Sequence, residues 1–146
     1  MKKRIVEDFR PYEAPATVFE DVDLVDIVHV FINNPMLHHI CVVNNEGRLI
    51  GLINRKRIFK SIFSHHVTAR SRVSNLLRFL TAETSGEIMV THIITATEED
   101  NIDDVIKNMI EHNIREIPIM DKEGRVIGFI TLLRIMKEWA AEQIDY

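Results

Sequence analysis

Apolar residues recur at helical spacing in the second half of the chain. The i, i+3, i+4, i+7, i+8 pattern is formed by Ile102, Val105, Ile106, Met109 and Ile110. Acidic residues precede and open this stretch, as suits the positive end of a helix dipole. We therefore expect an amphipathic helix that is capped by Thr97 or Asp100 and ends near His112 and Asn113.

Short apolar runs surround this helix. Residues 93–95 precede it and read as a strand, while residues 115–120 and 126–130 read as the two strands of a hairpin. The four residues 121–124 between them end in glycine, which suits a left-handed turn position. Pro118 has no N–H, so we expect its strand at a sheet edge or its nitrogen at a non-bonded position. A helix over 132–142 closes the β-α-β-β-α order.

The first half repeats this order. A strand at 17–19 is followed by a helix, then by hairpin strands at 39–43 and 49–53 and a helix over 55–63. Asn33-Asn34-Pro35 should stop the first helix. Its apolar face is predicted to hold Leu24, Ile27, Val28, Phe31 and Ile32. Residues 73–80 predict one more short helix, and Ser85-Gly86 mark a boundary.

The two halves are related by a constant shift of 77. Laying residues 18–63 over 95–140 without a gap gives about 13 identities in 46 positions. A duplicated unit predicts two similar lobes related by a pseudo-twofold, with clefts in related pairs. We divide the chain into repeat 1 (1–66), a connecting segment (67–84) and repeat 2 (85–146), and predict an α+β fold whose repeats pack through their sheets.

Composition narrows the class of protein. With 146 residues and 46% apolar content, one core or two small lobes can be buried. The single Cys41 lies in an apolar run and is expected to be a buried hydrophobe, so a reducing, cytoplasmic setting is the simpler interpretation. No apolar run approaches the roughly eighteen residues of a membrane span, so we expect no membrane association.

The net charge of −4 conceals a basic segment. From Asn54 to Arg78 there are seven Lys and Arg residues and no Asp or Glu. This segment could attract phosphates or an acidic partner, or it could simply form solvated helix faces. A nucleic-acid-associated module is a further alternative, but the nearby aromatic residues are better explained as apolar helix faces.

Signals for metal or catalysis are weak. Neighbouring histidines on a strand point to opposite faces, so His38-His39 is a poor chelating pair, and no His-x-x-x-His spacing occurs. There is also no phosphate-cradling glycine loop or nucleophile elbow. We expect no metal and no enzymatic activity.

The tandem β-α-β-β-α unit resembles the CBS domain, named after cystathionine β-synthase. The resemblance rests on Gly-Glu-Ile-Met before repeat 2 and on the hairpin Ile-Pro-Ile-Met-Asp-x-x-Gly-Arg-Val-Ile-Gly-Phe-Ile-Thr, and it covers nearly the whole chain. It implies a Bateman module, a homodimer in many cases, that binds AMP, ATP or S-adenosylmethionine in inter-repeat clefts and regulates an attached or separate partner.

The family's ligand motif, Gly-h-x-Thr/Ser-x-x-Asp/Asn with h apolar, departs from its usual form here. Its hydroxyl is present as Thr131, but Arg134 stands where the ribose carboxylate is expected. Repeat 1 has Asn54 and Arg57 at the same two positions. Asn54 and Thr131 read as N-caps, which places each arginine in the first turn of a helix. An arginine there would suit a phosphate, or it could point to solvent or meet an acidic side chain.

By the same resemblance, apolar residues would flank an adenine base. These are Ile94, Thr95, Ile117 and Pro118 in one cleft and Val18, Ile40 and Cys41 in the other. All of them are equally explained as core residues. Our leading hypothesis is a regulatory module that senses an adenine nucleotide or similar phosphorylated ligand and signals to a separate partner. The main alternative is a ligand-free dimeric scaffold that pairs through apolar helix faces.

Overall fold

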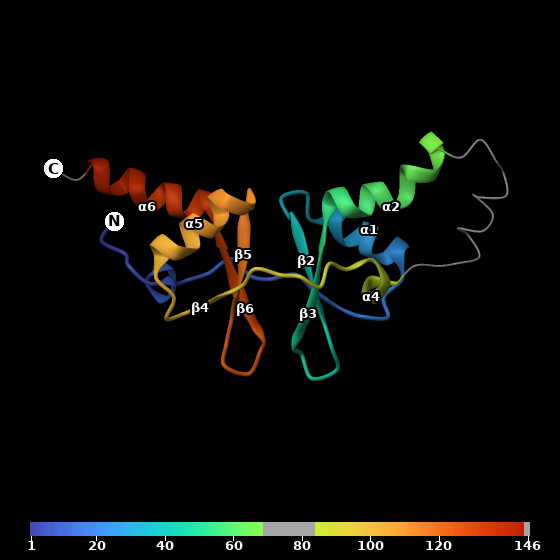
Figure 1. Cartoon of the computed structure of the whole chain (residues 1–146), viewed down its shortest axis with the longest axis horizontal. Coiled ribbons are helices and arrows are strands. Elements are labelled where there is room, and N and C mark those ends of the chain that lie inside the picture. Colours follow the sequence, from blue (N-terminus) through green and yellow to red (C-terminus); the bar gives the residue numbers. More distant parts are fainter. Residues whose placement is uncertain (69–83, 145–146) are drawn as a thin grey trace. The chain divides into compact units, whose positions relative to one another are not determined.

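The structure is a computed structural model that describes residues 1–68 and 84–144. The predicted helix at 73–80 lies outside these residues. The chain forms two compact units (Figure 1). The first-repeat unit contains residues 16–93, and the second-repeat unit combines residues 1–15 with residues 94–146.

The first-repeat unit has a three-stranded sheet in the order β1-β2-β3, in which β1 is parallel to β2 and β2 is antiparallel to β3. Apolar side chains of the sheet and helices form its core around Ile27, Ile40 and Ile53. Its elements are β1 (Thr17–Phe19), α1 (Leu24–Asn33), β2 (His39–Val43), β3 (Leu49–Asn54), α2 (Arg55–Thr68) and α4 (Ser85–Ile88).

The second-repeat unit has the same arrangement, with the sheet order β4-β5-β6 and the same strand directions. Its core gathers around Phe9, Ile117 and Ile130. Its elements are η1 (Val6–Phe9), β4 (Ala96–Thr97), α5 (Ile102–His112), β5 (Glu116–Met120), β6 (Val126–Thr131) and α6 (Leu132–Ile144). The predicted α+β class and the duplicated β-α-β-β-α order are confirmed.

The predicted helix ends are largely confirmed, but one cap is wrong. α5 ends at His112, and Asn113 adopts a left-handed conformation with φ 52°. Its N-cap is Asn101, whose side chain accepts a hydrogen bond from the Asp103 N–H, and not Thr97 or Asp100. The carboxylate of Asp100 instead accepts bonds from the N–H and hydroxyl of Thr97. The two acceptors at 100 and 101 are adjacent, so residue type alone could not choose between them.

Pro118 occupies a central strand, because β5 lies between β4 and β6. The prediction of an edge strand was wrong, and the alternative of a non-bonded position holds. Phe129, the partner of Pro118 on β6, directs its N–H away to the Glu13 carbonyl. On the opposite side of β5, its neighbour β4 begins only at Ala96, which pairs with Ile119. Pro118 therefore has no strand partner on that side that would need its missing N–H. The strand predicted at residues 93–95 thus lies further along the chain, at residues 96–97. Cys41 is the equivalent of Pro118 in the first-repeat unit, and its N–H donates to the Ala16 carbonyl. There β1 begins opposite Cys41, which is one position earlier than β4 begins relative to β5.

Each compact unit includes the segment that precedes the other repeat in sequence. Val6 and Phe9 of η1 are fully buried in the core of the second-repeat unit, and Ile88 of α4 is buried in that of the first. A few residues after each short helix, the chain forms an isolated antiparallel β-bridge with a strand. Glu13 pairs with Phe129 of β6, and Val90 pairs with Leu52 of β3. We call residues 1–15 and 84–93 the crossing segments.

Candidate functional site

The two strand-to-helix junctions, β3–α2 and β6–α6, carry the polar residues that the sequence singles out. The side chain of Asn54 accepts a hydrogen bond from the Arg57 N–H at 2.7 Å, and the hydroxyl of Thr131 accepts one from the Arg134 N–H at 3.1 Å. Both residues therefore act as the predicted N-caps, and both arginines occupy the third helical position. Thr131 is buried, and its hydroxyl accepts the capping hydrogen bond.

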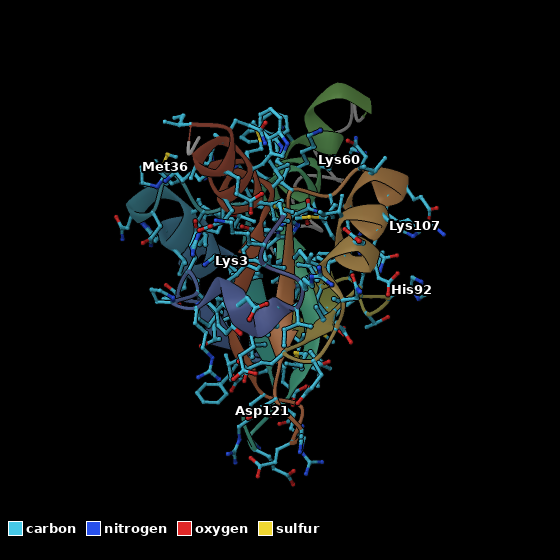
Figure 2. All side chains as sticks on the ribbon, turned by 90° about the vertical axis from the view of Figure 1, so that its left-hand side faces the viewer. Lys3, Met36, Lys60, His92, Lys107 and Asp121 are labelled. Atoms are coloured by element: carbon cyan, nitrogen blue, oxygen red, sulfur yellow. The ribbon has the colours of Figure 1, made fainter. Side chains whose placement is uncertain are left out.

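Arg134 is held by neighbours within the second-repeat unit. Its Nη2 lies 3.1 Å from Glu138 Oε1, and its Cζ lies 5.9 Å from the centre of the Phe9 ring. Lys3, just before η1 and labelled in Figure 2, lies 3.6 Å from the same oxygen of Glu138. The guanidinium therefore meets an acidic side chain, one of the alternatives left open by the sequence. The i, i+4 spacing of Arg134 and Glu138 could have identified this partner in advance.

Arg57 has a different environment in the first-repeat unit. Its Nε donates to the backbone carbonyl of Ile88 in α4, and the residue is exposed. Within residues 1–68 and 84–144, Arg57 forms no ion pair with a carboxylate. The position equivalent to Glu138 is Ser61. Of the two arginines at matched positions, Arg134 therefore pairs with a carboxylate, whereas the partner of Arg57 in the described residues is a neutral carbonyl.

The apolar residues proposed to flank a base lie in or against the cores. Ile40 and Ile117 belong to the two core clusters, and Pro118 is fully buried. Val18 and Ile94 are partly buried against their own cores, while Thr95 is exposed. Cys41, the seventh residue, is also fully buried, so the core interpretation accounts for six of the seven residues without a ligand.

The basic segment is described only in its first part. Arg55 donates to the carbonyls of Pro35 and Leu37 and lies 5.8 Å from the Phe31 ring centre, so it ties α2 to the end of α1. Lys56 and Lys60 are exposed, and Lys60 is labelled in Figure 2. The remaining cations of the segment, Arg70, Arg72 and Arg78, lie outside the described residues.

A second polar cluster, not predicted from the sequence, joins the N-terminal crossing segment to the loop between β4 and α5. Arg10 Nε and Tyr12 Oη each donate to Glu98 Oε2 at 2.6 Å. The Tyr12 and Arg10 bonds lower the pKa of Glu98, and the Glu98 carboxylate raises the pKa of Arg10. Burial, followed by the bond to Glu98, raises the pKa of Tyr12 to about 12. Tyr12 and Arg10 lie 86 and 88 positions before Glu98 in the sequence, so no local sequence pattern could predict the cluster.

Two further features concern the described part of the chain, namely metal-binding groups and membrane spans. No group of three or more His, Cys, Asp or Glu side chains there is arranged to hold a metal ion. None of the helices described combines the length and apolar character of a membrane span.

Duplicated sheet-and-helix units with capped arginine junctions define a tandem-repeat protein. The family model of the CBS domain matches residues 6–64 and 86–141, so the chain belongs to the CBS-domain family. CBS domain pairs are generally regulatory and not catalytic.

Similar proteins include both short and much longer chains. An uncharacterised protein of Methanocaldococcus jannaschii, MJ1426, is 27% identical over 80% of this chain and 81% of its own length. An L-aspartate semialdehyde sulfurtransferase of the same organism is 26% identical over 80% of this chain, but the match spans only 20% of its own length. A homoserine O-acetyltransferase of Methanococcus vannielii is matched over 24% of its length.

The fold also resembles solved structures of CBS domain pairs. The CBS domain pair of protein MJ0100, solved in complex with 5′-methylthioadenosine and S-adenosyl-L-methionine, has a TM-score of 0.70 and 25% identity, covering 94% of this chain and 97% of that one. CBSX2, solved in complex with AMP, has a TM-score of 0.73 and 18% identity, covering 99% of this chain and all of that one.

Proposed function

We propose that this protein is a regulatory module that senses an adenine nucleotide or a related phosphorylated ligand and signals to a separate partner. The observation that carries the proposal is its likeness to the MJ0100 pair, a CBS pair of nearly the same extent that binds two adenosine derivatives. Family membership supports a regulatory role. A ligand that binds one conformation more tightly than another would shift the population and so alter the surface that a partner meets.

Each of the two junctions would supply the polar part of a proposed site in its own repeat. Asn54 and Arg57 in the first repeat, and Thr131 and Arg134 in the second, would face the polar part of a bound ligand. The positive ends of the α2 and α6 helix dipoles add positive potential at the two junctions. The apolar part of the proposed site, which would flank the base, comprises Ile94, Thr95, Ile117, Pro118, Val18 and Ile40.

Arg57 offers the clearest test of ligand binding, because its side chain has a neutral carbonyl as its partner. Thermal unfolding is measured with millimolar AMP, ATP, S-adenosylmethionine and GTP. We expect an adenine nucleotide to raise the melting temperature, and Arg57→Ala to reduce that shift by at least half. Arg48→Ala serves as a matched control, because Arg48 is an exposed arginine of the same unit in the β2–β3 turn. A melting temperature that no nucleotide moves would refute ligand sensing by nucleotides.

A second candidate function, a dimeric scaffold, is favoured by an exposed apolar face on α6. Its residues are 40–58% exposed and follow helical spacing, namely Leu132, Leu133, Met136 and Trp139. A contiguous exposed patch of this kind is typical of a surface that binds another protein, here a second copy. We expect Trp139→Asp to convert a dimer to a monomer in size-exclusion chromatography with light scattering. Ala141→Asp, at an exposed position about 200° further around the helix, should leave the dimer intact.

A further inference from the structure

The two junctions differ in charge although they occupy equivalent positions. Residues 54–65 at the start of α2 contain four Lys and Arg residues and no carboxylate. The equivalent residues 131–142 at the start of α6 contain two cations and two carboxylates. A shift of 77 pairs Arg57 with Arg134, so the difference comes from the residues around each arginine and not from the arginines themselves.

Glu138 is the carboxylate that lies against the arginine. Its Oε1 is 3.1 Å from Arg134 Nη2, which is an ion-pair distance. Both side chains are only about a quarter exposed, at 25% for Arg134 and 23% for Glu138, so solvent screens the pair less than a fully exposed one. A phosphate approaching this guanidinium would compete with a carboxylate already bound to it and would be repelled by that carboxylate.

The pair is also fixed in place from outside α6. Lys3 lies 3.6 Å from Glu138 and 5.7 Å from the centre of the Phe9 ring, and Arg134 lies 5.9 Å from the same ring centre. Phe9 is fully buried, so both cations lie against a ring that is fixed in the core of the unit. The Arg57 guanidinium instead donates to a carbonyl, which carries no net charge and leaves the full positive charge available.

We propose that Glu138 sets the charge of the ligand that the second repeat accepts, disfavouring phosphates there and leaving the first repeat as the site for phosphorylated ligands. This inference rests on the proposed function, since it concerns the ligand selectivity of the same junctions. The second repeat then suits an uncharged or cationic adenosine derivative. Glu138 is a specificity-determining residue in this scheme, acting through Arg134.

The test is a set of calorimetric titrations with three ligands of rising negative charge, 5′-methylthioadenosine, AMP and ATP. They are carried out on the Arg57→Gln variant, so that the second repeat dominates binding. Adding Glu138→Gln should strengthen AMP binding about three- to tenfold, the size of one charge interaction near the surface. ATP should gain at least as much, and 5′-methylthioadenosine should change by less than about twofold. The gain should shrink in 0.5 M salt.

Two further variants complete the design. Glu142→Gln is the matched control, because Glu142 lies one turn further along α6 and pairs with the N-terminus and the Lys2 N–H. It should leave all three affinities unchanged. Ser61→Glu, in an otherwise unaltered chain, places a carboxylate four residues after Arg57 and should weaken AMP binding by about three- to tenfold.

The possible failures are distinguishable. If AMP binds and Glu138→Gln leaves its affinity unchanged, or shifts all three ligands by the same factor, the role of Glu138 is refuted and ligand sensing stands. If none of the three ligands binds the unaltered chain, both proposals are refuted.

Discussion

Two glycines occupy equivalent strand positions, and each lies beneath a side chain of a crossing segment. A Cβ added to Gly128 would lie 2.4 Å from the Cβ of Tyr12 and 3.1 Å from the Glu13 carbonyl oxygen. A Cβ added to Gly51 would lie 2.3 Å from the sulfur of Met89. Neither position offers room for a side chain, but the two obstacles differ, since Tyr12 meets the new atom with its stem and Met89 mainly with its flexible end.

This difference predicts unequal costs of the same substitution. We expect Gly128→Ala to lower the free energy of unfolding by about 2–3 kcal/mol, because the Tyr12 stem and the backbone must shift. Gly51→Ala should cost less, about 1–2 kcal/mol, because another Met89 rotamer can move its Sδ and Cγ away, which leaves a contact of 2.8 Å with the Met89 Cβ, longer than the 2.4 Å contact at Tyr12. Urea denaturation of both variants measures the difference, and a larger cost at Gly51 would contradict this account.

Single residues also show what the sequence could reveal about the site. Asn54 and Thr131 were identifiable as caps, because an amide or hydroxyl before a helical run is a local signal. The environments of the two arginines were only partly accessible. Glu138 lies one turn from Arg134 in sequence, whereas the carbonyl partner of Arg57 belongs to Ile88, 31 residues away. Contacts of that kind depend on the tertiary fold.

At the scale of elements, the N-terminal crossing segment is attached by polar bonds as well as by its apolar core residues. Within the segment itself, the Asp8 carboxylate accepts the N–H groups of Arg4 and Ile5, which stabilises the start of η1 and lowers the pKa of Asp8. The side-chain attachment to the loop between β4 and α5 runs through Glu98. Glu98 accepts bonds from Tyr12 and Arg10, which lower its pKa in the same way. A carboxyl group with a lowered pKa stabilises the fold above its ordinary pKa, and this contribution is lost as the pH falls through the folded-state value.

The attachment of this segment should therefore weaken in acid. Between pH 7 and pH 3 we expect the melting temperature of the wild type to approach that of Glu98→Gln, because protonated glutamic acid and glutamine carry the same charge. Tyr12 has the opposite effect at high pH. Because its pKa is raised to about 12, its contribution to the stability of the fold is lost only as the pH rises towards that value. Thermal unfolding from pH 3 to about pH 12 measures both effects. A constant gap between the two proteins down to pH 3 would contradict the role of the Glu98 carboxylate.

Local sequence patterns predicted most of these elements, because apolar periodicity reports directly on which face of a helix or strand is buried. The short β4 and the central position of Pro118 were exceptions. Both depend on which strand lies next to which, and no window of sequence contains that information. η1 and α4 were also missed as helices, since four residues are too few for a periodic pattern.

On the scale of the whole molecule, the sequence repeats and the compact units divide the chain at different places. Our division by repeats separates 1–66 from 85–146, and the family model matches 6–64 and 86–141. The compact units instead place residues 1–15 with 94–146 and residues 84–93 with the first repeat. Chain duplication is visible in the sequence, whereas the exchange of segments appears only in the packing.

Fragments can distinguish the two divisions. Residues 16–93 contain the whole core cluster of the first-repeat unit, so we expect this fragment to show native-like amide dispersion in NMR spectra. Residues 94–146 lack Val6 and Phe9, a loss of roughly 4–7 kcal/mol of core packing, and should be largely unfolded. A peptide of residues 1–15 added in trans should restore the fold. A folded 94–146 fragment without the peptide would contradict the importance of the crossing segment.

The exchange of crossing segments bears on the ancestry of the molecule. A gene that encoded one repeat alone would have produced a chain whose leading segment could complete the core of a sister chain. Such an ancestor would have become stable by mutual exchange between two copies. Fusion of two gene copies would then have brought the exchange inside one polypeptide, leaving each half free to diverge.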